Sequence, residues 1–127
     1  MRQAGRYMAD FRKYSDKIPF RQRSENPEIA TELSLQCWRA FGVDGVIMFS
    51  DILTILPALG IEFDVVKGKG PQIEDTPRTA ERVAKFEADA KKFDPTSQLP
   101  FVAQTLKNLR KETEGKTTLV GFVGAPW

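Results

Sequence analysis

Residues 26–53 read NPEIATELSLQCWRAFGVDGVIMFSDIL, and this stretch decides the fold. Asn26 carries a side chain suited to cap a helix, Pro27 presets the first helical φ angle, and an acid follows where the helix dipole is positive. Apolar residues then recur at helical spacing until Gly42, which suits a helix end. We therefore predict a helix over residues 27–41. Its apolar face comprises Ile29, Leu33, Cys37 and Phe41, flanked by Ala30, Trp38 and Ala40.

A short apolar run, VIMF at residues 46–49, follows this helix. Such a run is typical of a strand that is covered on both faces in a parallel sheet. Asp51 then lies just past the carboxyl end of the predicted strand, between Ser50 and further apolar residues. An acid in this place is commonly a helix N-cap or a turn residue. At the carboxyl end of a barrel strand, however, it is placed for catalysis.

A small excursion follows. Residues 61–65 alternate apolar and acidic side chains, as a half-exposed strand does, and residues 67–71 read as a turn. We expect this segment to leave the main sheet.

The last third of the chain returns to helix and strand. We predict a charged amphipathic helix over residues 79–91, a break at Asp94-Pro95, a second helix from Phe101 to Leu109 that Gly115 closes, and a buried strand over residues 117–122. The order of helix, strand, excursion, helix and strand is that of βα units, so the predicted fold class is α/β.

The composition of the 127 residues, 41% hydrophobic and 28% charged, is that of one globular domain. A formal net charge of +2 gives no general case for a nucleic-acid or membrane partner, and we expect neither. Histidine is absent and Cys37 is the single cysteine, which excludes a Cys/His zinc site and a Ser-His or Cys-His catalytic arrangement within these residues. Chemistry here has to use carboxylate, guanidinium or phenol groups.

The first seven residues read MRQAGRY and begin a locally basic segment. Arg2 and Arg6 stand four residues apart, with Gly5 beside the second. Arginine donates two parallel hydrogen bonds to a carboxylate, and glycine lets the backbone approach a ligand closely. These residues favour a polycarboxylate ligand, and two surface arginines in ordinary ion pairs are the alternative.

Three blocks in order resemble the uroporphyrinogen decarboxylase family: MRQAGRY at residues 1–7, FSDIL at 49–53 and GFVGAPW at 121–127. They match its N-terminal substrate-binding motif, the surroundings of its central aspartate and its next strand-to-loop segment. The resemblance implies a (β/α)8 TIM barrel, and a complete barrel needs roughly 200 to 400 residues. We therefore expect residues 1–127 to be the N-terminal part of a single TIM-barrel domain of this family, incomplete at both ends.

The resemblance also implies an activity. The family removes the four acetate side chains of uroporphyrinogen III as carbon dioxide and leaves the methyl groups of coproporphyrinogen III, in haem and chlorophyll synthesis. It assigns the catalytic role to Asp51, whose carboxylate accepts the pyrrole N–H groups and stabilises developing positive charge. It assigns substrate binding to Arg2, Gln3, Ala4, Gly5, Arg6 and Asp51. It implies no cofactor, no metal and a homodimer.

Two alternatives stay open. A barrel relative that transfers methyl groups from corrinoid substrates would use a zinc site supplied late in the chain, and a non-catalytic truncated product would keep the N-terminal sequence without the barrel. We expect the 127-residue piece alone to lack decarboxylase activity and to fold poorly, because an open parallel sheet leaves unpaired edge strands. The family's later tyrosine, serine and histidine have no counterpart here.

Residues 23–26 and 66–71 resemble forms from photosynthetic organisms, so cytoplasm and plastid stroma both remain possible compartments.

Overall fold

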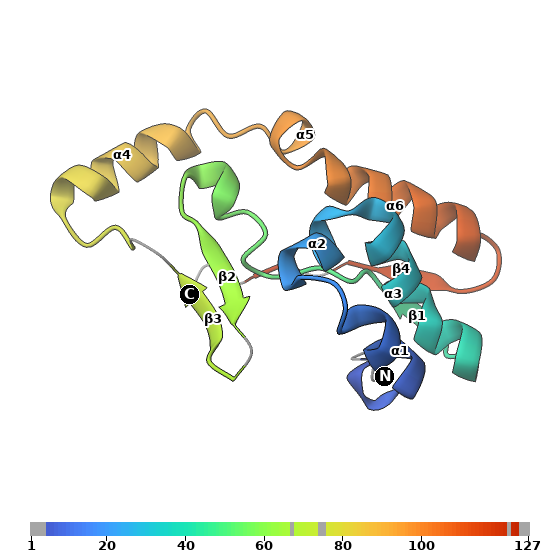
Figure 1. The fold of residues 1–127 in the computed structure, drawn as a ribbon. Coiled ribbons are helices and arrows are strands. Elements are labelled where there is room, and N and C mark those ends of the chain that lie inside the picture. The colour runs from blue at the N-terminus through green and yellow to red at the C-terminus, as the bar shows by residue number, and fades with distance from the viewer. Residues whose placement is uncertain (1–4, 67, 74–75, 122, 125–127) are drawn as a thin grey trace. The chain divides into compact units, whose positions relative to one another are not determined.

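The computed structural model describes residues 5–66, 68–73, 76–121 and 123–124 (Figure 1). The chain divides into two compact units, Met1–Ile52 with Phe101–Trp127, and Leu53–Pro100. The first unit contains η1 (Gly5–Tyr7), α1 (Ala9–Ser15), α2 (Phe20–Glu25), α3 (Pro27–Phe41), β1 (Gly45–Ile47), α6 (Pro100–Thr113) and β4 (Thr118–Val120). The second contains η2 (Pro57–Leu59), β2 (Phe63–Val66), β3 (Gly70–Ile73), α4 (Ala80–Ala90) and α5 (Pro95–Gln98).

Helix α3 confirms the prediction for residues 27–41. The Asn26 side chain accepts hydrogen bonds from the backbone N–H groups of Glu28 and Ile29, each at 3.0 Å. At the other end Gly42 adopts a left-handed φ of 59° and its N–H bonds to the carbonyl of Trp38. Both ends are therefore fixed by residues next to the helix, which is why the sequence locates them.

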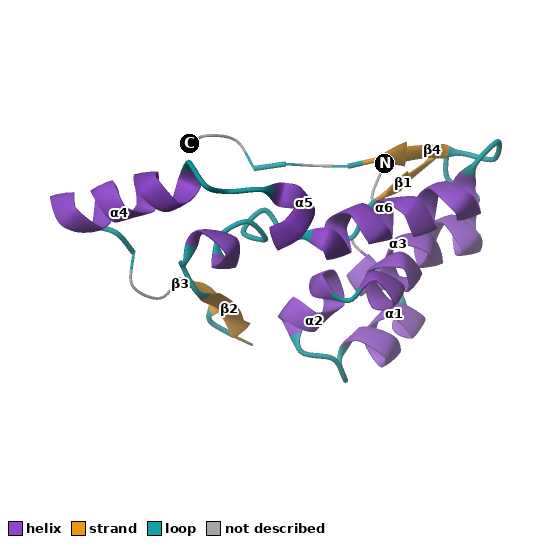
Figure 2. Cartoon of the chain, turned by 90° about the horizontal axis from the view of Figure 1, so that it is seen from above, coloured by secondary structure: helices purple, strands orange, loops and turns teal. Residues whose placement is uncertain are grey.

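Strands β1 and β4 pair in parallel, with Val46 opposite Leu119. Helices α3 and α6 pack on one face of this pair, and Figure 2 shows them along the same side of the strands. The buried members of this core are Leu35, Val46, Met48 and Leu109, and the partly buried ones are Trp38, Val102, Leu106 and Leu119. Two neighbouring parallel strands with helices on one face are the repeating unit of a (β/α)8 barrel.

In the described part of the chain, the other face of the strand pair is less covered. Side chains alternate along a strand, so Ile47, Thr118 and Val120 lie opposite the helix-facing residues. Thr118 is exposed and Val120 is 37% exposed. The predicted buried strand over residues 117–122 is thus wrong in its burial, because helices cover only one face of β4. A closed barrel fills the other face with side chains from its remaining strands. Phe122 lies outside the described residues.

The second unit is built around an antiparallel hairpin of β2 and β3. The strand predicted at residues 61–65 is present and begins at Phe63. The predicted turn at 67–71 is too long, because Gly70 and Pro71 already belong to β3. The connection is short because the Lys69 N–H bonds to the Val66 carbonyl at 3.0 Å.

The helices that follow confirm two predictions and correct a third. Helix α4 is the predicted helix at 79–91, and α6 extends the predicted helix at 101–109 to Thr113. Asp94-Pro95 does not simply interrupt the chain but begins α5, because the Asp94 carboxylate accepts hydrogen bonds from the N–H groups of Thr96 and Ser97.

Candidate functional site

The described part of the first sequence block forms the short helix η1, whose Gly5 is buried. A Cβ atom at position 5 would lie 2.2 Å from Cδ2 of Phe11, a separation that no real pair of carbons tolerates. The glycine is therefore required by the ring packed against it, in addition to any ligand it approaches. Arg2, Gln3 and Ala4, three of the predicted binding residues, lie outside the described residues.

Contacts to α3 hold the end of this block. The Tyr7 hydroxyl lies 3.7 Å from Sγ of Cys37, which lies 3.5 Å from Sδ of Met8. The Tyr7 ring also packs at 6.2 Å from the ring of Phe41. Cys37 is only 2% exposed, so its thiol has a packing role and is remote from solvent.

Arg6 lies near two other arginines, Arg12 and Arg23. The Arg6 side chain is exposed, and its backbone carbonyl accepts a hydrogen bond from Nη1 of Arg12 at 2.7 Å. Partial burial lowers the pKa of Arg23 from its ordinary value, Asp16 opposes that change, and the positive charge of Arg6 adds to it. Arg6 and Arg23 repel each other, and the carboxylate of Asp16 already offsets this repulsion at Arg23.

Between the end of β1 at Ile47 and Asp51, the chain is bonded to α3. The N–H of Phe49 donates to Oγ of Ser34 at 2.7 Å, and the same hydroxyl donates to the Ala30 carbonyl at 2.6 Å. Ser34 is 1% exposed, so this is a buried connection between helix and strand. Asp51 itself is partly buried, two residues beyond the connection.

The structure brings the described parts of all three sequence blocks together. The Phe11 ring packs on Gly5 of the first block and lies 6.3 Å from the Phe49 ring of the second. A Cβ at Gly124 of the third block would make ordinary contact, at 3.6 Å, with Ile52. These contacts gather at the carboxyl end of β1, where a barrel enzyme has its active site. Pro126 and Trp127 lie outside the described residues.

Sequence reasoning did not identify Phe11 and Ser34, although both connect parts of the site. Both residues act through packing or hydrogen bonding, and their residue types alone do not indicate such a role. The sequence offered one signal, since Phe11 is the aromatic residue that follows the first block at a spacing of one helical turn from Tyr7. That spacing indicates a neighbour but not a contact with Gly5.

Two surface grooves of the first unit lie away from this convergence. One, of about 410 Å³, is lined by residues 42–44 and 115–118 together with Trp38, at the amino ends of β1 and β4. In a barrel that end contributes to stability rather than to catalysis. The other, of about 450 Å³, lies between α1 and α3 and is lined by Asp10, Lys13, Tyr14, Lys17, Ile18 and Gln36.

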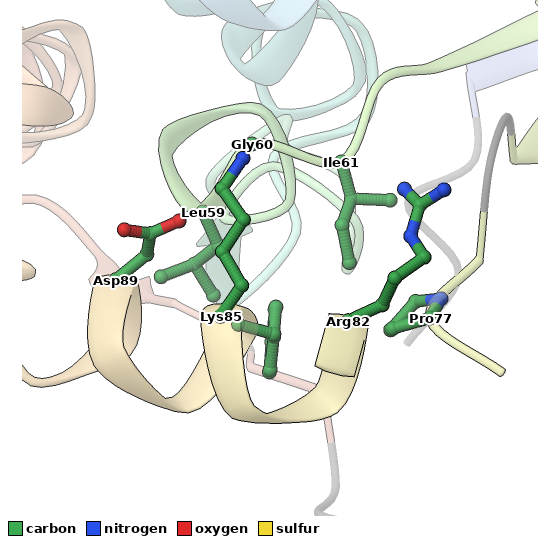
Figure 3. A pocket seen from close by; sticks show the side chains of 8 residues that line it. Leu59, Gly60, Ile61, Pro77, Arg82, Lys85 and Asp89 are labelled. Carbon is green, nitrogen blue, oxygen red and sulfur yellow. The ribbon is translucent and has the colours of Figure 1, made fainter. Parts of the chain in front are cut away.

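The second unit has a small pocket against α4 (Figure 3). Arg82 and Lys85 extend from the helix toward the turn at residues 59–61. The volume of about 40 Å³ is far below the roughly 300–1,000 Å³ of a small-molecule site. This pocket does not compete with the end of β1 as a substrate site.

Within residues 5–66, 68–73, 76–121 and 123–124, no three His, Cys, Asp or Glu side chains gather as a metal site requires. In the same ranges no helix is long and apolar enough to cross a membrane.

The paired parallel strands, the helices on one face and the acid after the first strand define the chain as part of a (β/α)8 barrel protein. A solved methyltransferase from Methanosarcina mazei has the same fold, with a TM-score of 0.65 at 20% sequence identity. The match covers 90% of this chain and 34% of the methyltransferase. At that identity the likeness concerns the fold alone.

The sequence comparisons are more specific. The family model for uroporphyrinogen decarboxylase (URO-D) matches residues 1–127. Curated uroporphyrinogen decarboxylases from Synechocystis sp. and Crocosphaera subtropica are 56% and 55% identical to the chain over 128 aligned positions. One from Prochlorococcus marinus is 49% identical. The chain belongs to the uroporphyrinogen decarboxylase family. All of it aligns, but it spans only 35% of the Synechocystis protein.

Proposed function

We propose that the complete protein to which these residues belong is a uroporphyrinogen decarboxylase. The observation that carries the proposal is the 56% identity, over the whole chain, to a curated protein of that name. The convergence of the three sequence blocks at the carboxyl end of β1 supports it, because this is where a barrel enzyme binds its substrate. The corrinoid methyltransferase alternative has only fold likeness in its favour.

The reaction needs no cofactor because the substrate supplies its own electron sink. A proton added to a pyrrole carbon makes the ring an electron acceptor. The bond between the acetate methylene and its carboxylate then breaks, its electron pair moves into the ring, and carbon dioxide leaves. The methylene takes up a proton and the ring loses one, so each acetate consumes one proton and becomes a methyl group. Four repetitions convert uroporphyrinogen III to coproporphyrinogen III.

In this proposal Asp51 is the catalytic residue. Its carboxylate accepts the pyrrole N–H groups and stabilises the positive charge that develops on the protonated ring, an electrostatic contribution that is large in a water-poor cleft. The anchored strand end supports this role, since the Ser34 bond to Phe49 restrains the backbone before the acid.

Arg2 and Arg6 hold the carboxylates of the substrate, and Gln3, Ala4 and Gly5 form the backbone of the same binding loop. The exposed Arg6 side chain, with Arg12 bonded to its backbone carbonyl, supports this assignment, because two positive charges favour anionic side arms. Guanidinium groups suit the task through their bidentate geometry.

The remaining proposals concern the whole protein. Residues 1–127 form the N-terminal part of a single barrel domain, which works as a homodimer without cofactor or metal and without nucleic-acid or membrane partners. The protein acts in the cytoplasm or the plastid stroma. The cyanobacterial relatives support the cytoplasm.

The test uses the longest open reading frame that contains this segment. Purified protein is supplied anaerobically with uroporphyrinogen III, and the porphyrins formed after oxidation are separated by chromatography. We expect coproporphyrin as the end product. Asp51→Ala should lower kcat by about 10²–10³-fold, and Arg6→Ala should chiefly raise KM. Wild-type protein that folds but forms no coproporphyrin contradicts the proposal, and equal changes of kcat and KM in both variants contradict the division of roles.

A further inference from the structure

Phe11 connects two blocks of the proposed site while belonging to neither. It lies on α1 and is 3% exposed. A Cβ at Gly5 would lie 2.2, 2.8 and 2.8 Å from three atoms of its ring, so the ring lies directly on the loop backbone. The same ring lies 6.3 Å from the ring of Phe49, with the two planes inclined by 51°. A single side chain thus separates the loop that bears Arg6 from the strand end that leads to Asp51.

The strand side of this contact is rigidly held. Phe49 has its N–H bonded to the buried Ser34 hydroxyl at 2.7 Å. The residue before it, Met48, is tied to β4 by a bond from its N–H to the Val120 carbonyl at 2.9 Å. Because the strand end is fixed on two sides, we expect a change in the Phe11 ring to displace the short helix η1 that packs against it.

The loop side has no room to adjust inward. Gly5 already omits the side chain that any other residue would bring against the ring. The distance between loop and strand end is therefore set by the size of Phe11 and not by a flexible side chain.

We propose that Phe11 is a positioning residue of the decarboxylation site, which sets the spacing between the carboxylate-binding loop at Arg6 and the strand end at Asp51. This inference rests on the proposed function. Each pyrrole ring of a tetrapyrrole polycarboxylate carries its carboxylate arms on short chains, so bond lengths limit the distance between a carboxylate and the N–H group of the same ring. The enzyme must match that distance if arms and pyrrole N–H groups are to be bound together. A substitution far from the reacting atoms that displaces the bound substrate by about 1 Å lowers the rate by as much as about 10²-fold.

The test compares Phe11→Leu with Leu109→Ala in the complete protein. Leu109 lies on α6 and is fully buried in the core that α3 and α6 form with the strands, a cluster that does not include Phe11. Both variants should lower the melting temperature. Assays well below that temperature should give a kcat for uroporphyrinogen III that is about 10–100-fold lower in Phe11→Leu and within about twofold of wild type in Leu109→Ala. Phe11→Met, which keeps most of the volume, should recover much of the loss and serves if Phe11→Leu does not fold.

A double-mutant cycle adds a readout that a merely structural role would not move. Gly5→Ala places a methyl group against the ring, so its effect on kcat/KM should be smaller in the Phe11→Leu background than in the wild type. Independent effects of the two substitutions, or a normal kcat in folded Phe11→Leu and Phe11→Met, would overturn the positioning role. Wild-type protein without decarboxylase activity would instead overturn the proposed function and this inference with it.

Discussion

The two units of the chain differ in the interactions that stabilise them. The first unit contains eight of the nine buried hydrophobic residues in the described ranges, and the second contains only Phe63. All the buried polar residues in those ranges, Ser15, Ser24, Ser34, Thr105 and Thr113, also lie in the first unit. The second unit depends on turns and caps close in sequence, and no residue of α4 is buried. Apart from Leu53, the described residues of the three sequence blocks lie in the unit with the buried core.

The sharpest test of this contrast compares a helix of each unit. Leu109→Ala on α6 removes a fully buried side chain and should lower the free energy of unfolding by about 2–5 kcal/mol. Val83→Ala on α4, where the side chain is 41% exposed, should change it by no more than about 0.5 kcal/mol. Denaturant titration of the complete protein measures both. Similar losses for the two variants would show that the units do not differ in the way described.

A second prediction concerns the packing that joins the first two blocks. Gly5→Ala should lower the free energy of unfolding by about 1–3 kcal/mol, because the new methyl group overlaps the Phe11 ring. Gly121→Ala is the matched control, since a Cβ there meets nothing within 4 Å and the backbone has an ordinary φ. Thermal denaturation compares the two. An unchanged melting temperature for Gly5→Ala would contradict the close approach of Phe11.

The smallest expected effect lies in the second unit and depends on pH. Hydrogen bonds from Ser97 and Thr96 lower the pKa of the exposed Asp94 carboxyl below its ordinary value. The stabilisation of α5 by this cap is present above the unfolded-state pKa and is lost as the pH falls through the lower, folded-state pKa. Amide chemical shifts of Thr96 and Ser97 should follow that titration. In Asp94→Asn, which keeps a capping oxygen without the ionisation, they should stay constant over the same pH range.

Sequence patterns correctly predicted those features of the fold that depend on residues close together in the chain. Both ends of α3 follow from Asn26 and Gly42, whose bonds are made within the helix itself. The three blocks identified the family, and the comparisons confirm it. By contrast α1 and α2 were not predicted, because neither Met8 nor Pro19 at their starts makes a capping side-chain hydrogen bond.

What the sequence could not predict depends on distant partners. The apolar run of β4 is typical of a strand covered on both faces, yet its burial depends on strands that are not among these residues. Phe11 and Gly5 are six residues apart, and this spacing is compatible with several backbone conformations, so the sequence does not predict their contact. Phe49, some 38 residues further along the chain, then lies against the same ring. Pairings of this kind depend on tertiary packing and leave no periodic pattern.

The most direct test of the account is hydrogen exchange of the complete protein with and without a uroporphyrin ligand. Binding should slow exchange at residues 5–12, 49–53 and 121–124, where the three blocks converge. Exchange in α4, beside the small pocket at Arg82 and Lys85, should be unchanged. Protection confined to α4, or none at the carboxyl end of β1, would contradict the claim that these blocks form one substrate site.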